Sequence, residues 1–156
     1  MKLLIGIGNE LKGDDAIGVF VAENFRAEEW KCINAGTVPE NFLGVVRREK
    51  PELLVLVDAA EMSLPPGSVR IIPRERANSM FYSTHSLPLG EFIERAEGHS
   101  ESILLIGVQP FRAGLDEKMS PEVKAAAEKL MQLLRREEFY ELEELAKESN
   151  KYKNIL

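Results

Sequence analysis

The sequence predicts a three-layer α/β/α fold built on a mostly parallel, twisted sheet of about five strands, one of them short and antiparallel. Two observations lead to this prediction. Apolar runs of strand length alternate with amphipathic segments of helix length over most of the chain. One short alternating run, Val69–Ile72, is reached through turn-forming residues with no helical segment before it, which favours an antiparallel position.

The first strand begins at Leu3 as an apolar, β-branched run bounded by glycines. A turn follows the strand, and a helix opens at Asp14 or Asp15. The apolar stripe of this helix continues to about Arg26. The chain therefore begins with a strand, a turn and a helix, and two adjacent carboxylates lie where the helix starts.

The second strand is predicted at Lys31–Ala35. The helix after it starts at Pro39 and stops before Pro51, because a residue that precedes proline disfavours helical backbone. Leu53–Val57 is the most apolar run in the chain, and it ends at Asp58. Such a run predicts a central strand that is covered on both faces.

The alternating run Val69–Ile72 stops at Pro73, which is typical of an edge strand. A long irregular segment, 74–86, comes next, and loops of this length inside a compact domain usually carry function. The remaining predicted elements are a helix at 88–97, a strand at 103–108, and a helix that begins at Pro121 with Ser120 as its N-cap.

A chain of 156 residues corresponds to about one domain. We expect residues 1–136 to form the α/β domain and residues 137–156 to be a charged, helical extension of that domain, exposed to solvent and burying little. An apolar content of 44% argues against disorder. No apolar run approaches the roughly 20 residues that cross a membrane, so no membrane insertion is expected.

The composition also limits the compartment and the partners. Met1 and Lys2 lead directly into the first strand, so no signal peptide is expected. Cys32 is the single cysteine, which excludes an internal disulfide and favours a reducing cytoplasm; inside its strand it is interpreted as a small core residue. The net charge of −6 argues against a nucleic-acid partner.

The turn after the first strand does not have the spacing of a dinucleotide-binding loop. Gly6 and Gly8 fit the first two glycines of that motif, but Leu11 stands in place of the third. The carboxylates of Asp14 and Asp15 would repel a pyrophosphate. This edge of the sheet is therefore better suited to a cation or a proton, although Asp14 and Asp15 could also serve only the helix start.

Three chargeable side chains are expected at the carboxyl edge of the sheet. Asp15 follows the first strand, Asp58 follows the third, and His85 lies in the long loop. Two carboxylates and an imidazole could hold a divalent metal such as nickel or zinc, or could act as a general acid–base set. Taken singly, Asp58 could cap a turn and His85 could bond to backbone. His99 lies in a polar turn and is expected to have no role.

Several motifs in this order resemble the hydrogenase maturation endopeptidases, and in particular the branch that serves hydrogenase 3. The resemblance runs from about residue 3 to residue 135. The motifs are Gly6-x-Gly8-Asn9, Gly13-Asp14-Asp15, Ala35–Asn41, Val57-Asp58-Ala59, Thr84–Leu89 and Gly107-Val108-Gln109-Pro110.

The resemblance implies an endopeptidase that removes a C-terminal extension from the large-subunit precursor of a nickel–iron hydrogenase after nickel insertion. It implies that Asp15, Asp58 and His85 contact the metal, and that Gly36 and Thr37 lie along the substrate. Nickel is then expected to arrive with the precursor and not to be held stably by the enzyme. The alternative is a nickel-binding carrier with the same three residues and no hydrolytic activity.

Two mechanisms remain open at this point. In one, nickel carried by the precursor positions or polarises the scissile amide. In the other, a carboxylate activates water directly, as in aspartyl-type peptidases, and nickel serves only for recognition. No serine or cysteine is paired with a base in the sequence motifs, which argues against a covalent route.

Overall fold

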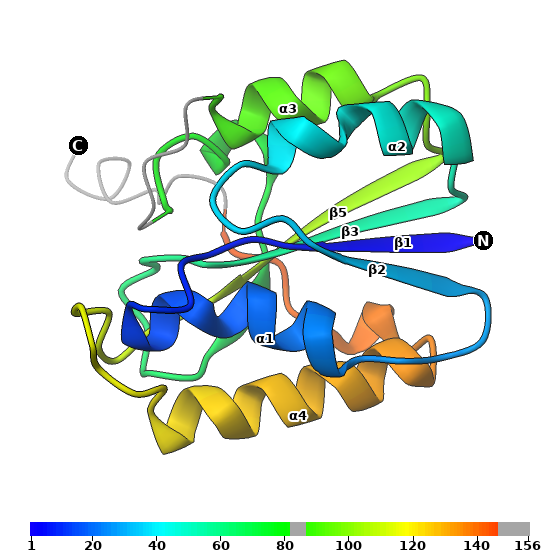
Figure 1. Cartoon of the computed structure of the whole chain (residues 1–156). Helices are drawn as coiled ribbons and strands as arrows, with labels where there is room; N and C mark the ends of the chain where they lie inside the picture. The colour runs from blue at the N-terminus through cyan, green and yellow to red at the C-terminus, as the bar shows by residue number, and fades with distance from the viewer. Residues whose placement is uncertain (82–86, 147–156) are drawn as a thin grey trace, which may run out of the picture.

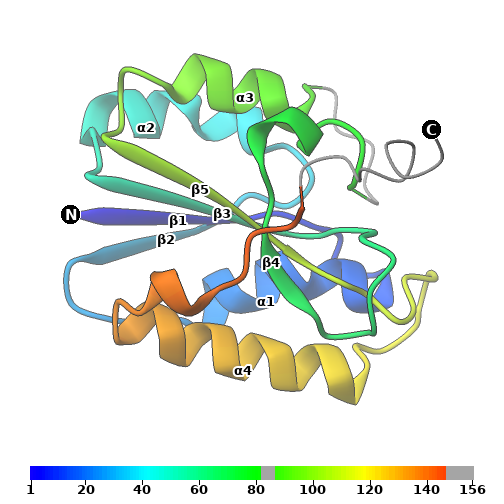
Figure 2. The same ribbon diagram turned by 180° about the vertical axis from the view of Figure 1, so that it is seen from behind.

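The strands form one twisted sheet with the order β2-β1-β3-β5-β4 (Figures 1 and 2). The computed structural model describes residues 1–81 and 87–146. The strands β1, β2, β3 and β5 run parallel, and β4 is antiparallel to β5 at one edge. Their bounds are Lys2–Gly6 (β1), Trp30–Asn34 (β2), Leu53–Ala59 (β3), Val69–Ile71 (β4) and Ser102–Val108 (β5). The predicted fold class is confirmed.

The helices cover both faces of the sheet. Helices α1 and α4 lie on one face, and α2 and α3 lie on the other (Figures 1 and 2). Their bounds are Ile17–Asn24 (α1), Leu43–Glu49 (α2), Leu89–Ala96 (α3) and Pro121–Arg135 (α4). Short 3-10 helices, η1 at Gly13–Ala16 and η2 at Pro39–Phe42, lead into α1 and α2. No helix among the described residues is long and apolar enough to cross a membrane.

The core consists of two apolar clusters separated by the sheet. Side chains alternate along β3, so Leu54 and Leu56 belong to the cluster under α2 and α3, whereas Val55 and Val57 belong to the cluster under α1 and α4. All four are fully buried. Burial of each such side chain contributes roughly 1.5–3 kcal/mol. The prediction of a central strand covered on both faces is confirmed.

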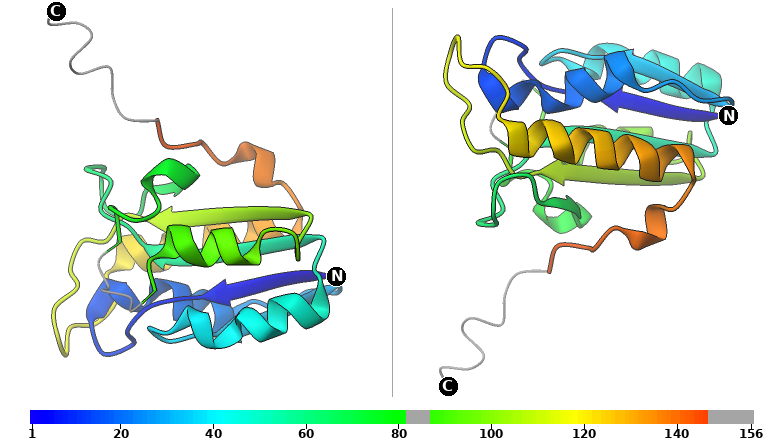
Figure 3. Two further views of the ribbon diagram at one scale, coloured as in Figure 1. Left: turned by 90° about the horizontal axis from the view of Figure 1, so that it is seen from above. Right: turned by 90° about the horizontal axis from the view of Figure 1, so that it is seen from below.

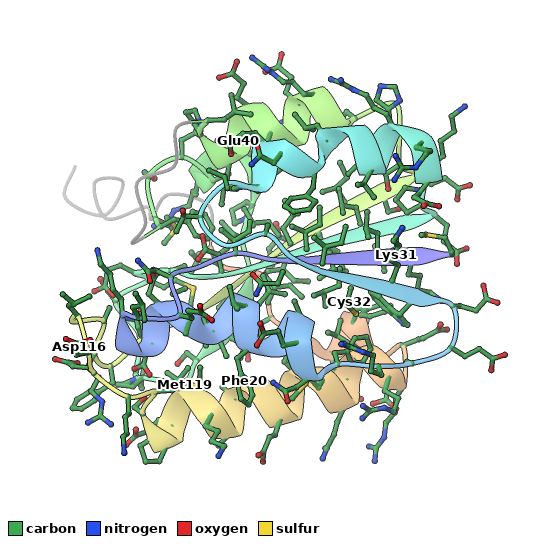
Figure 4. The ribbon with its side chains drawn as sticks, in the orientation of Figure 1. Phe20, Lys31, Cys32, Glu40, Asp116 and Met119 are labelled. Carbon is green, nitrogen blue, oxygen red and sulfur yellow. The ribbon has the colours of Figure 1, made fainter. Side chains whose placement is uncertain are left out.

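Cys32 lies on β2, the edge strand opposite β4 (Figure 4). Its side chain is half-buried and not fully enclosed, as expected for an edge strand. The thiol Sγ donates to the carbonyl oxygen of Phe25 at 3.4 Å, and burial raises the pKa of the thiol.

The strand order places a topological switch point between β1 and β3. The two strands are neighbours, but the chain leaves β1 for β2 on one side and leaves β3 for β4 and β5 on the other. Connections that diverge in this way open a crevice at the carboxyl ends of the two strands. For this strand order the rule predicts a crevice directly beyond Gly6 and Ala59.

The predicted helical extension over 137–156 is wrong for its described part. Helix α4 ends at Arg135, a short 3-10 turn follows at Phe139–Glu141, and the next residues run along the free edge of β4. Figure 3 shows this segment leaving the end of α4, and Figure 2 shows it passing beside β4. Residues 147–156 lie outside the described residues.

This terminal segment, residues 139–146, is anchored to the sheet edge by backbone and apolar contacts. Ile71 N–H donates to the carbonyl of Glu143 at 2.9 Å, and Leu145 N–H donates to the carbonyl of Ile71 at 2.8 Å. Three apolar side chains, Phe139, Leu142 and Leu145, pack against the two core clusters. The segment docks although it is highly charged, because it gains hydrogen bonds to the backbone of β4 and buries its apolar side chains.

Candidate active site

The turn between β1 and α1 approaches the sheet unusually closely. A Cβ on Gly18 would lie 2.1 Å from the carbonyl oxygen of Val57 and 2.3 Å from that of Ile7. A Cβ on Gly8, whose φ is 151°, would lie 1.9 Å from the carbonyl oxygen of Asp15. Only glycine fits at these two positions, and the fit brings η1 against β3.

Asp15 is placed by this turn. Its carboxylate is buried, and Oδ2 accepts a hydrogen bond from the backbone N–H of Asn9 at 3.0 Å. The side chain of Asn9 in turn accepts from the N–H of Leu11 at 2.9 Å, which closes the loop on itself. The backbone N–H of Asp15 donates to the carbonyl of Lys12 at 3.0 Å. The loop therefore fixes Asp15 at the carboxyl end of β1.

Asp58 occupies the corresponding place on β3. It is fully buried, and Oδ1 accepts from the N–H of Ala59 at 2.8 Å. Its strand position pairs with Gly107 on β5. On the other side, Ile7 N–H donates to the carbonyl of Val57 at 2.9 Å, which locks the end of β1 beside Asp58. Two buried carboxylates thus flank the switch point from neighbouring strands.

His85 lies outside the described residues, so its predicted position beside Asp15 and Asp58 stays a prediction. The described chain before it is held next to the site. Glu61 N–H donates to the carbonyl of Met80 at 2.7 Å, and Phe81 forms an antiparallel bridge with Ala60. Within residues 1–81 and 87–146, no three His, Cys, Asp or Glu side chains gather closely enough to hold a metal ion.

Gly36 and Thr37 lie in a groove of about 260 Å³ beside the β1 turn. Gly8 N–H donates to the carbonyl of Gly36 at 2.9 Å, and the N–H of Gly36 donates to the side chain of Asn34 at 2.9 Å. The groove also includes Asn9, whose N–H binds Asp15. An extended segment lying in this groove would therefore lead toward the Asp15 carboxylate.

Asp14 has a structural role that its sequence position did not reveal. The carboxylate is fully buried and accepts hydrogen bonds from the N–H of Phe111 at 2.8 Å, of Arg112 at 3.0 Å and of Ser120 at 2.6 Å. It also accepts from the Ser120 hydroxyl at 2.8 Å. Ser120 was predicted to cap α4, but its side chain makes no cap hydrogen bond there, because the hydroxyl is used by Asp14.

Gln109 joins two further loops of the same edge. Its side chain is buried, and Oε1 accepts from the N–H of Met62 at 2.7 Å, while Nε2 donates to Glu61. Gln109 follows β5 and Glu61 follows β3, so the pair fixes the loops after the two strands relative to each other. Neither Asp14 nor Gln109 could be assigned from local sequence, because their partners lie about 50 or 100 positions away in the chain.

The sequence and the structure are similar to those of proteases that mature hydrogenases. The sequence profile of a family described as HycI, hydrogenase maturation protease, matches residues 19–137. The hydrogenase 3 maturation protease of Escherichia coli strain K12 is 34% identical over 136 residues, covering 85% of this chain and 87% of that protein.

Solved structures agree with the sequence match. The solution structure of the endopeptidase HycI from Escherichia coli superposes with a TM-score of 0.86 at 32% identity, covering 96% of this chain and 99% of that one. The crystal structure of a NiFe hydrogenase maturation protease HycI from Thermococcus kodakarensis KOD1 superposes with a TM-score of 0.76 at 35% identity, covering 86% and 90%.

Proposed function

This chain belongs to the hydrogenase maturation protease family, and we propose that it cleaves the large-subunit precursor of a nickel–iron hydrogenase at its C-terminal extension. It is accordingly a peptide hydrolase. The proteases and endopeptidases among its relatives favour cleavage over the alternative of a nickel carrier without hydrolytic activity. The observation that carries the assignment of its site is the pair of buried carboxylates, Asp15 and Asp58, at the switch point.

We assign the chemistry to Asp15 and Asp58, with His85 as the third member of the set. Hydrolysis of the amide consumes one water, whose oxygen bonds to the scissile carbonyl carbon while the carbon–nitrogen bond breaks. One carboxylate takes the proton from this water and delivers it to the departing amine nitrogen. The N–H of Asn9 donates to Asp15 Oδ2 and orients this carboxylate at the carboxyl end of β1.

Nickel enters this scheme as part of the substrate. Two carboxylates and one imidazole are an incomplete set for a firmly held metal, which usually has four protein ligands rich in Cys and His. Ligands already on the precursor would complete the coordination, so binding would test whether the precursor has received its nickel. The metal would position or polarise the scissile amide.

Gly36 and Thr37 are proposed to lie along the extended segment that is cut. Their groove joins the β1 turn and includes Asn9, whose N–H donates to Asp15. We also propose that the protein acts in the cytoplasm, because its single thiol suits a reducing compartment. The net charge of −6 gives no reason to expect a nucleic acid among its partners.

The first test is cleavage of purified precursor, followed by mass spectrometry of its C-terminus. Wild-type enzyme, treated with a chelator that is then removed, should cut nickel-loaded precursor and leave nickel-free precursor intact. Asp15→Asn, Asp58→Asn and His85→Ala should each lower the cleavage rate by at least about a hundredfold, since general acid–base groups contribute roughly 10²–10⁴-fold.

Glu128→Gln is the matched control, because it makes the same acid-to-amide change on an exposed carboxylate of α4. It should keep the wild-type rate. Efficient cutting of nickel-free precursor by metal-free enzyme would exclude nickel-dependent recognition and favour direct activation of water by a carboxylate. Full activity of a folded Asp58→Asn variant would remove Asp58 from the site.

A further inference from the structure

The exposed large apolar side chains of the described residues all lie at one edge of the molecule. Leu11, Val38, Phe111 and Leu115 expose 60%, 39%, 63% and 65% of their surface. Leu11 follows β1, Val38 follows β2, and the other two follow β5. All four therefore lie in loops at the carboxyl ends of parallel strands, the same edge that carries Asp15 and Asp58.

Three of these side chains, Leu11, Phe111 and Leu115, form what we call the edge patch. Their loops are joined by backbone hydrogen bonds: Asp116 N–H donates to the carbonyl of Leu11 at 2.8 Å, and Gly13 N–H donates to the carbonyl of Glu117 at 3.1 Å. Figure 4 shows Asp116 at the tip of this loop pair, beside the start of α1. The two loops therefore present one connected surface.

The buried carboxylate of Asp14 holds the loop that carries Phe111. The Asp14 carboxylate accepts from the N–H of Phe111 and of Arg112, and the Asp14 N–H donates to the carbonyl of Arg112 at 2.7 Å. The guanidinium Nε of Arg112 donates to the carbonyl of Lys118 at 2.9 Å and closes the loop. Loops fixed in this way lose little conformational entropy when a partner binds.

The edge patch is continuous with the candidate active site. Leu11 also lines the groove that contains Gly36 and Thr37. That groove includes Asn9, which binds Asp15. A partner that covers the edge patch would therefore have its neighbouring segment at the groove and the carboxylates.

We infer that the edge patch docks an apolar surface on the folded body of the precursor protein, separate from the extended segment that is cut; this inference rests on the proposed function. Exposed apolar groups gathered at one place mark interaction sites. A second copy of this chain on the same surface would cover the groove and the crevice, which an enzyme acting on a protein must keep open. The same two loops also carry exposed charges of both signs, namely Glu10, Lys12, Arg112, Asp116, Glu117 and Lys118. We therefore assign recognition of the precursor to apolar contact and not to charge.

The test compares wild type with the double variant Phe111→Ser/Leu115→Ser on nickel-loaded, full-length precursor. The variant should raise KM by roughly tenfold or more, as loss of apolar anchors at an interface typically does. Its kcat should stay within about twofold of wild type, because both are exposed apolar side chains with no acid–base group to contribute to the chemistry. Raising the salt concentration should change the wild-type KM little, since apolar contacts are not screened.

Leu133→Ser is the matched control, because it makes the same kind of change on a partly buried leucine in the last turn of α4. This turn lies on the side of the molecule where the parallel strands begin, whereas the edge patch lies where they end (Figure 1). Its KM should equal that of wild type. Circular dichroism and urea unfolding check that each variant is folded.

An unchanged KM in the folded double variant would overturn the inference, and so would a lower kcat at constant KM. A wild-type dimer that the double variant converts to a monomer, measured by light scattering after size exclusion, would assign the patch to self-association and also overturn it. If wild type cuts no precursor, the proposed function fails. The docking inference is then tested by calorimetry of precursor binding to wild type and to the variant. Weaker binding by the variant would support the inference, and equal binding would overturn it.

Discussion

Asp14 and Asp15 are adjacent in sequence, and their carboxylates bind different parts of the molecule. Asp14 accepts hydrogen bonds from the loop that follows β5, whereas Asp15 accepts one from the turn that follows β1. In a 3-10 helix, consecutive side chains point about 120° apart, which allows this division. We therefore expect substitutions of the two residues to have different effects, one on stability and the other on chemistry.

Asp14→Asn should lower the free energy of unfolding by about 2–3 kcal/mol. The amide NH₂ of asparagine would face the Arg112 N–H and the Ser120 hydroxyl, which now donate to the carboxylate. A buried donor without an acceptor costs roughly 1–3 kcal/mol. Urea denaturation followed by Trp30 fluorescence measures this change. Asp116→Asn, on an exposed residue, should stay within about 0.5 kcal/mol of wild type. Equal unfolding midpoints for both variants would show that Asp14 is not the anchor of the loop.

Helix α1 packs closely against the sheet at Gly18. Gly18→Ala should lower the free energy of unfolding by roughly 3 kcal/mol, since its Cβ would lie 2.1 Å from a backbone oxygen of β3 that cannot move cheaply. Gly44→Ala is the matched control on α2, where a Cβ meets nothing within 4 Å. It should raise the free energy of unfolding by about 0.5–1 kcal/mol, through helix propensity. Thermal unfolding of the two variants gives the comparison, and a neutral Gly18→Ala would contradict the close packing.

The strands and helices could largely be predicted from sequence because their signals are local. The apolar run at Leu53–Val57 identifies β3, and Pro73 identifies β4 as an edge strand. The connections between loops could not be predicted, since Asp14 and Ser120 meet only after the sheet has formed. Of the candidate site, Asp15 and Asp58 could be placed at the carboxyl edge because they follow the first and third predicted strands of a mostly parallel sheet, while their hydrogen-bond partners required the structure.

The terminal segment connects parts of the protein that are far apart in the sequence. Phe139 packs near Trp30 with ring centroids 6.1 Å apart, and Leu145 reaches the cluster under α2 and α3. Lys2 Nζ donates to Glu137 at 2.5 Å, which raises the pKa of the Lys2 ammonium. High charge after Arg135 predicted a solvated helix, and this was wrong because the sheet edge offers both hydrogen bonds and apolar surface.

Truncation after residue 136 should lower the free energy of unfolding by about 2–4 kcal/mol, given the half-buried side chains of Phe139, Leu142 and Leu145 and the lost hydrogen bonds to β4. Truncation after residue 146 keeps these contacts and serves as the control. At a temperature where both truncated proteins are folded, kcat should remain near wild type, because the contacts described for residues 139–146 are made with β4, Arg76 and the two core clusters. Denaturant unfolding and the precursor cleavage assay measure the two effects. An unchanged unfolding midpoint for the shorter protein would show that the segment contributes nothing to the fold.

The pairing of residues 143–145 with β4 also bears on colloidal behaviour. Ile71 presents one N–H and one carbonyl at the sheet margin, and both are occupied by the terminal segment. A free strand margin is a template on which another polypeptide can add, and such addition leads to aggregates. By pairing with β4, the terminal segment prevents another chain from pairing there and so opposes aggregation. Preparations shortened to residue 136 should become turbid at concentrations where the longer protein stays clear.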